Sequence, residues 1–285
     1  MIRNLVKRTL RLYFRDGASV FFSLLAVLII MGLYVLFLGD VILSDMKDMP
    51  GARFLMDSWV MSGLLCVASI TTTMGAFGIM VEDRAKNILK DFFASPIKRS
   101  ALVGGYLGGT FLIGMVMSLL TFLCAELYIV AYGGEWVSWA ALIKVLGIMV
   151  LSVISSSSIV FFMVSFFNSL NAFGTASSLL GTLIGFLTGI YIPIGNLPAG
   201  VQTVVKCFPV SHSGALFRQV LMASPLEQTF AGVPAAQVNS YKVAAGVVYR
   251  FGDQLTGPLF SISVLIVTTI VFFALATLNL SRKMK

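Results

Sequence analysis

Six stretches of this chain are long enough and apolar enough to cross a lipid bilayer as single helices. They are residues 20–38, 59–81, 101–130, 139–167, 172–192 and 258–280. A helix needs about 20 residues to span the hydrocarbon core, and each run comes close to that length or exceeds it. The runs are continuous and lack the ten-residue alternation of barrel strands. The sequence therefore predicts an all-α integral membrane protein with six transmembrane helices.

The composition agrees with lipid as the surrounding solvent. Hydrophobic residues make up 58% of the chain and charged residues 11%, whereas soluble domains carry roughly 45–50% and about 25%. The net charge is +8, but the basic residues flank the apolar runs. That placement favours a role in membrane topology over nucleic-acid binding. We therefore expect contact with membrane lipid and none with nucleic acid.

The basic residues also predict the orientation of the chain. Thirteen of the twenty Lys and Arg residues fall on one side of the membrane if all six runs span it. The thirteen are Arg3, Lys7, Arg8, Arg11, Arg15, Arg84, Lys86, Lys90, Lys98, Arg99, Arg282, Lys283 and Lys285. Because cytoplasmic segments near spans are enriched in Lys and Arg, both termini are expected in the cytoplasm.

Residues 1–16 precede the first span and read as a basic amphipathic helix. At about 100° per residue, Arg3, Lys7 and Arg11 share one face, and Leu5 and Leu12 lie on the opposite one. A helix of this kind lies in the headgroup layer, here as an N-terminal interfacial helix. The alternative is a simple topology anchor.

Residues 82–100 link the second and third spans on the predicted cytoplasmic side. Apolar residues recur in this segment at i, i+1, i+4 and i+5, and they are Ile88, Leu89, Phe92 and Phe93. Pro96 ends the helical pattern, because a proline and the residue before it are disfavoured in a helix. The pattern predicts a short amphipathic helix lying under the membrane.

Phe92 and Phe93 have no evident core of their own, which favours docking of a soluble partner. We expect Asp83, Arg84 and Lys90 to surround them as a charged rim. Two alternatives remain open here. The segment is a solvated loop helix, or its phenylalanines press on the spans of their own chain.

A stripe of small residues marks the fifth span. Gly181, Gly185 and Gly189 recur at i, i+4 and i+8. Such a stripe lets two helix backbones approach closely in a membrane. It predicts either an interface with a second protomer or close packing within one protomer.

Residues 193–257 form a long segment on the predicted outer side. Its first part, residues 192–209, is apolar but too short and too rich in proline to span. Residues 210–221 read as a second short helix. The segment is typical of re-entrant or interfacial helices placed before the last span.

The chain lacks the patterns of an ATP-binding site or an active site. No glycine is followed directly by lysine, which excludes the phosphate loop G-x-x-x-x-G-K-[ST]. The glycine-rich stretch 104–109 (GGYLGG) is not a nucleotide cradle, since no lysine follows it and no strand precedes it. The chain has one histidine, His212. We therefore predict no catalytic residue, no metal site and no cofactor in this chain.

Together these features resemble the ABC transporter permeases of the type-2 exporter class. The matching residues are Glu82-Asp83-Arg84 through Ser95-Pro96-Ile97-Lys98-Arg99, then Pro193, Leu197-Pro198, Phe208-Pro209 and Arg218. The resemblance covers essentially the whole chain, as a single transmembrane permease domain over residues 1–285. It implies an N-terminal interfacial helix, six spans, a cytoplasmic coupling helix and two outer re-entrant helices, placed in the plasma (inner) membrane.

The resemblance also implies partners and a function. A separate ABC-type ATPase would bind ATP and Mg and dock on the coupling helix. A second permease protomer, identical or paralogous, would meet the fifth span. The expected activity is export of an amphipathic substrate such as a drug, antibiotic or peptide, as in multidrug efflux. The alternatives are export of a lipid or lipid-linked cell-envelope glycan, a membrane assembly or signalling subunit without cargo, and a channel or secondary transporter.

Overall fold

A computed structural model of the protein describes residues 2–39, 49–95 and 97–283, and the side chains of Phe37, Leu38, Phe93 and residues 281–283 lie outside that description. Among the described residues, six helices are long and apolar enough to cross a membrane, which confirms the prediction of an all-α membrane protein. They are α2 (Gly17–Leu33, continued by the π-helical turn Tyr34–Leu38), α4 (Ala52–Ala85), α6 (Arg99–Ala131), α7 (Trp139–Val164), α8 (Leu170–Leu187) and α13 (Pro258–Lys283).

Shorter elements connect these helices. They are α1 (Ile2–Arg15), α5 (Ile88–Ala94), the 3-10 turn η2 (Ile194–Asn196), α9 (Ala199–Cys207), α10 (Pro209–Leu221), α11 (Ala223–Thr229), α12 (Ala235–Ala244) and the strands β1 (Arg250–Phe251) and β2 (Gln254–Leu255). The two strands form an antiparallel hairpin in which Arg250 faces Leu255.

Helix α4 is the centre of the bundle. Most of its residues are buried, and α2, α6, α7, α8 and α10 all pack against it. Helix α13 packs on α7 and α10 and leaves much of its surface exposed, as do α2 and α8. A central helix surrounded by others meets protein on every side, which explains why α4 is buried nearly all round.

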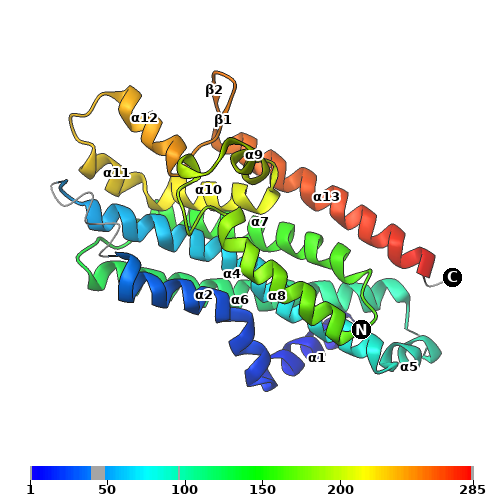
Figure 1. The fold of residues 1–285 in the computed structure, drawn as a ribbon. Helices are drawn as coiled ribbons and strands as arrows, with labels where there is room; N and C mark the ends of the chain where they lie inside the picture. Colours follow the sequence, from blue (N-terminus) through cyan, green and yellow to red (C-terminus); the bar gives the residue numbers. More distant parts are fainter. Residues whose placement is uncertain (1, 40–48, 96, 284–285) are drawn as a thin grey trace.

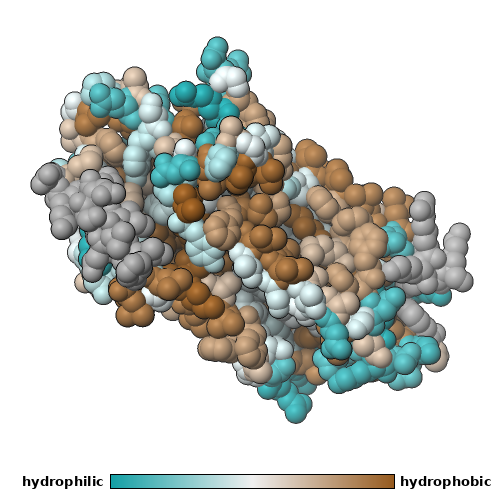
Figure 2. Space-filling view, in the orientation of Figure 1, coloured by the Kyte–Doolittle hydropathy of each residue, from teal (hydrophilic) through white to brown (hydrophobic). Residues whose placement is uncertain are grey.

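The bundle has two distinct ends (Figure 1). Helices α1 and α5 and the C-terminal end of α13 lie at one end, which we call the α5 end. Helices α9 to α12 and the hairpin lie at the other, which we call the α10 end. Figure 2 shows hydrophilic surface at both ends and a broad hydrophobic band between them. Helix α1, the segment 82–100 and the last turn of α13 thus lie at the same end of the bundle.

Helix α1 confirms the helix predicted over residues 1–16, and the structure shows where it sits. Its inner face packs across α6, where Leu5 and Thr9 are buried against Gly105 and Gly109. A Cβ atom added at Gly109 would lie 2.6 Å from Cβ of Thr9. Helix α1 therefore packs on the glycine-rich stretch 104–109 of α6, because only glycine lets the two backbones come this close.

At the α10 end the chain turns back in short helices. Gly189 has a φ of +64° and terminates α8, so this helix ends at Leu187, well before the predicted limit at residue 192. The predicted second short helix is present as α10, with Pro209 in its first turn. Helix α10 is largely buried against α4, α7 and α13.

Candidate functional site

The segment 82–100 forms a sharp turn at the α5 end. Helix α4 runs on to Ala85, and Asn87 then takes a left-handed conformation with φ 59°. Helix α5 follows, and Ser95 is extended with φ −91° and ψ 159°, as a residue before proline should be. The predicted short helix is therefore present, and it ends at Ala94. Pro96 itself lies outside the described residues.

Asp83 lies inside the protein and joins three helices. Its side chain is 4% exposed and accepts two hydrogen bonds from the guanidinium of Arg8, at 2.7 and 2.8 Å. The hydroxyl of Tyr106 on α6 donates a third at 2.5 Å. The hydrogen bond to Asp83 raises the pKa of Arg8 above its usual value. Because bidentate charge-assisted bonds are strong and directional, this contact fixes α1, α4 and α6 relative to one another.

Arg84 also points inward, toward the end of α7. Its guanidinium donates to the carbonyl oxygens of Val164 at 3.2 Å and Phe167 at 2.7 Å. A cation beside the last carbonyls of a helix is stabilised by the helix dipole and satisfies groups that have no partner within the helix. Arg84 thus connects the segment 82–100 to α7.

Of the other predicted site residues, Lys90 is exposed. Phe92 is half-buried and packs against the hydrophobic core of the bundle, with the guanidinium carbon of Arg8 5.4 Å from its ring centroid. The side chain of Phe93 lies outside the description. The sequence analysis placed Asp83 and Arg84 beside these phenylalanines as an exposed rim. The structure turns both inward, since they find partners on α1, α6 and α7 that hydropathy cannot reveal.

A cleft of about 1020 Å³ opens between α2, α4 and α8. Hydroxyl groups from all three helices line it, among them Ser19, Thr71, Ser178 and Thr182. Apolar side chains such as Phe22 and Ile29 on α2 complete its walls. Helices α2 and α8 both pack on α4 but leave most of their own surface exposed. The cleft therefore combines polar and apolar lining within helices that are long enough to span a membrane.

The three glycines of the predicted stripe have different surroundings. Gly181 lines the cleft, and a Cβ atom added there would meet nothing within 4 Å. Gly185 faces the ring of Tyr191 in the same chain, and Gly189 lies beyond the end of α8 against Ile194. The close approach at Gly185 and Gly189 thus takes place within this chain. Of the three positions, only Gly181 faces open space.

A buried arginine organises the α10 end, and the sequence analysis did not assign it a role. Arg218 on α10 is fully buried, and it donates to the carbonyl oxygens of Thr188 at 3.1 Å and Gly189 at 3.2 Å. A longer contact of 3.5 Å reaches the carbonyl oxygen of Gly246. Its guanidinium carbon lies 5.1 Å from the ring centroid of Trp59. The signal available in the sequence was a single arginine within the apolar helix 210–221.

The fold and the site together define a multi-pass membrane protein of the permease kind, with a polar-lined cleft between its spans and charged anchors at both ends. Residues 53–278 match the family described as ABC-2 family transporter protein, and the chain belongs to this family. The match extends from the first turn of α4 to the last turns of α13 and includes the segment 82–100. This protein is therefore a membrane subunit of an ABC transporter, as the sequence resemblance implied.

One curated protein gives a more distant similarity. Nodulation protein J from Rhizobium meliloti (strain 1021) is 26% identical to this chain over 91 residues. The alignment covers 32% of this chain and 35% of that protein.

Proposed function

We propose that this chain is the transmembrane subunit of an ATP-driven exporter, and that the cleft between α2, α4 and α8 is half of its translocation path. A second permease protomer, identical or paralogous, faces the open side of the cleft and completes the path. A separate ABC-type ATPase supplies the energy and binds ATP and Mg. This chain itself carries out no hydrolysis.

The cleft is the observation that carries the proposal. Its volume of about 1020 Å³ is at the upper limit of roughly 300–1,000 Å³ for pockets that hold drug-sized ligands. Hydroxyl groups within apolar spans suit a substrate that is itself amphipathic, such as a drug, an antibiotic or a peptide. Asp16 and Glu82 stand where the cleft reaches the α5 end. Export of a lipid or lipid-linked glycan through the same path is the alternative.

The orientation follows from the charge distribution. The α5 end carries the basic residues of α1, of the segment 82–100 and of the last turn of α13. By the positive-inside rule this end faces the cytoplasm, and α9 to α12 lie on the outer side of the plasma membrane. The ATPase then approaches from the α5 end and contacts α5 through Lys90, Phe92 and Phe93.

The buried anchors explain how such docking acts on the spans. Asp83 ties the end of α4 to α1 and α6, and Arg84 ties it to α7. A displacement of α5 by the ATPase is therefore passed directly to these helices. Coupling requires two arrangements of the spans, of which the ATP-bound ATPase favours one.

The path is tested with a matched pair of bulky substitutions. Gly181 lines the cleft and Gly147 lies on the exposed side of α7, and neither has an atom within 4 Å of an added Cβ. We expect Gly181→Trp to abolish transport and substrate-stimulated ATP hydrolysis by the reconstituted transporter, and Gly147→Trp to leave both near wild type. Normal transport by a well-folded Gly181→Trp variant would exclude this cleft as the path.

Docking of the ATPase is tested at the phenylalanines of α5. Fully burying one large apolar side chain contributes roughly 1.5–3 kcal/mol, so two of them can anchor a small interface. The double variant Phe92→Ala/Phe93→Ala should insert and fold, yet lose co-purification with the ATPase. Phe14→Ala removes an exposed phenylalanine of α1 at the same end and is the control. If the double variant co-purified with the ATPase at the wild-type stoichiometry, docking at α5 would be contradicted.

A further inference from the structure

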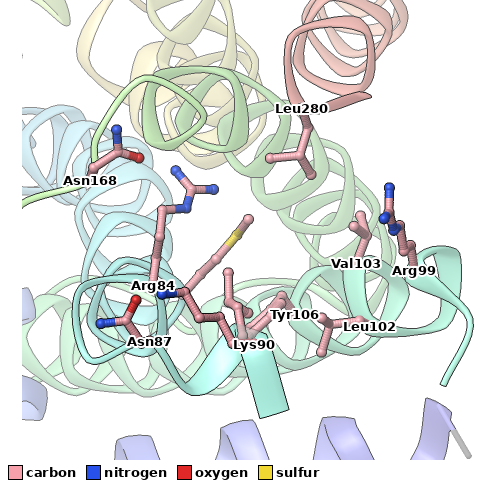
Figure 3. A pocket seen from close by; sticks show the side chains of 11 residues that line it. Arg84, Asn87, Lys90, Arg99, Leu102, Val103, Tyr106, Asn168 and Leu280 are labelled. Carbon is pink, nitrogen blue, oxygen red and sulfur yellow. The ribbon is translucent and has the colours of Figure 1, made fainter. Parts of the chain in front are cut away.

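A second cavity lies at the α5 end, apart from the cleft (Figure 3). Its volume is about 220 Å³, and it is enclosed by the ends of α4, α6 and α13, by α5 and by the link between α7 and α8. This is smaller than the roughly 300–1,000 Å³ typical of drug-sized ligands. The cavity therefore suits a single small group, such as the head of a larger molecule.

The polar lining of the cavity is cationic. Arg84, Lys90 and Arg99 contribute their side chains from α4, α5 and α6, and the amides of Asn87 and Asn168 add hydrogen-bonding capacity. Figure 3 shows Arg99 on the opposite wall from Arg84 and Lys90. Among the described lining residues there is no carboxylate. Basic side chains on facing walls of one cavity favour an anion, and phosphate suits both guanidinium and ammonium donors.

The apolar lining adds a second requirement on the ligand. Leu102 and Val103 in the first turns of α6 and Leu280 near the end of α13 form the remaining wall. The cavity thus lies where the membrane-spanning helices end, which is the level of the lipid headgroups. Basic pockets between spans at this level bind anionic lipid headgroups. A ligand that fits both walls carries an anionic head and an apolar tail.

We propose that this cavity binds the phosphate of an anionic phospholipid, with Lys90 and Arg99 as its main cationic contacts. The start of the acyl chains then runs along Leu102, Val103 and Leu280. Arg84 contributes positive charge while it holds the end of α7. Because Lys90 belongs to α5 and Arg99 to α6, the bound headgroup bridges the two helices and holds α5 in place. Free phosphate offers the same anionic group without the apolar part.

The deciding experiment compares two adjacent basic residues. The purified full-length permease is titrated in detergent with dioleoyl phosphatidylglycerol or dioleoyl phosphatidylcholine, and bound lipid is counted by native mass spectrometry. We expect tighter binding of phosphatidylglycerol. Arg99→Gln should weaken it about tenfold or more, because a hydrogen bond to a charged group is lost. Lys98→Gln is the matched control, since Lys98 is exposed and does not line the cavity.

Two further measurements distinguish phospholipid from free phosphate and check that each variant is folded. Inorganic phosphate should compete only weakly, since it lacks the acyl chains; competition at equal concentration would assign the site to free phosphate and overturn the lipid. A thermal melt of each variant checks the fold. Lys90→Gln is a second substitution in the cavity, and because Lys90 is also a proposed ATPase contact, its effect is measured only in the lipid titration, which contains no ATPase. Equal affinity for the two lipids, or equal losses in Arg99→Gln and Lys98→Gln, would overturn the proposal.

This inference goes beyond the proposed transport function and fails separately from it. The titration contains no ATPase and no transported substrate, and Arg99 belongs neither to the cleft nor to the ATPase contact. Loss of lipid binding in Arg99→Gln with intact co-purification of the ATPase would support the lipid site alone. Failure of Gly181→Trp to block transport would leave the lipid titration unaffected.

Discussion

At each end of the bundle an arginine donates to oxygen atoms inside the protein, but the two arginines differ in burial and in the kind of acceptor. At the α5 end, Arg8 meets the carboxylate of Asp83 at 2.7 and 2.8 Å, and its side chain stays 30% exposed. At the α10 end, Arg218 is fully buried and donates to the backbone carbonyls of Thr188 and Gly189. Among the described residues, no carboxylate forms a salt bridge with Arg218.

This difference indicates which end is built to rearrange. In the pair between Arg8 and Asp83 only Arg8 is partly exposed, so Arg8 can turn toward water when the pair separates, while Asp83 keeps the hydrogen bond from Tyr106. Arg218 instead holds the C-terminal end of α8, where the helix dipole favours a cation. Its release would leave a charge and several carbonyls buried without partners. The α5 end therefore suits motion, such as that driven by the ATPase docking proposed above, and the α10 end suits a fixed anchor for the cleft.

The largest expected effect is the loss of this anchor. Arg218→Met should destabilise the protein by about 3 kcal/mol or more, because each buried carbonyl left without a donor costs about 1–3 kcal/mol. The stability of Arg218→Lys should lie between those of Arg218→Met and the wild type, because one ammonium group cannot replace the fixed set of N–H donors on the planar guanidinium. Thermal unfolding in detergent measures both variants. A Met variant as stable as wild type would show that the desolvation of Arg218 offsets its hydrogen bonds.

A smaller effect is expected at the pair of the α5 end. Asp83→Asn removes charge-assisted bonds worth about 1.5–3 kcal/mol, but Arg8 can then turn toward water. The exchanged variant Arg8→Asp/Asp83→Arg should recover part of the loss. The recovery is partial because Tyr106 donates to Asp83 and cannot donate to arginine. A double-mutant cycle on the free energy of unfolding measures the coupling energy between Arg8 and Asp83. A coupling energy near zero would show that this pair does not hold the α5 end, and the comparison with Arg218 would fail.

The helices were predictable from the sequence, but their ends were not. Hydropathy over about 20 residues is a strong signal, and all six spans are found. The predicted second span covers residues 59–81, whereas α4 runs from Ala52 to Ala85. Each of the added turns contains a buried carboxylate that is hydrogen-bonded inside the protein. Asp57, just before the predicted start, accepts a hydrogen bond from the hydroxyl of Tyr34 at 2.7 Å, and Asp83 accepts from Arg8.

The contacts that define the site depend on residues far apart in the chain. Asp83 and Arg8 are 75 positions apart, and Arg218 and Thr188 are 30 apart. No periodicity within one helix contains this information. The glycine stripe of the fifth span shows the same limit, because its spacing suggested one continuous face. The positive φ of Gly189, which ends α8, is not visible in that spacing.

The packing of α1 against Gly105 gives a third prediction, the second one at the α5 end. Gly105→Ala places a Cβ against Leu5 and should cost about 1–2 kcal/mol through overpacking. Gly104→Ala is the matched control, since its nearest atom, Cδ1 of Ile2, lies at 3.8 Å, an ordinary contact. Limited proteolysis at the arginines of α1 should be faster only in Gly105→Ala. Equal protection of the two variants would mean that Arg8 and Asp83 alone hold α1 in place.

The smallest effect is expected at a second ion pair, one residue before the first along α4. Lys86 and Glu82 approach to 2.5 Å, yet their side chains remain 60% and 45% exposed. An exposed pair gains little, because water screens the attraction and two long side chains must be ordered. Lys86→Gln should therefore leave the melting temperature unchanged, whereas Asp83→Asn lowers it. The comparison therefore sets a buried carboxylate with three hydrogen bonds against an exposed pair with one contact. A loss in Lys86→Gln as large as that in Asp83→Asn would show that charge along this turn, and not the buried contact with Arg8, holds the α5 end together.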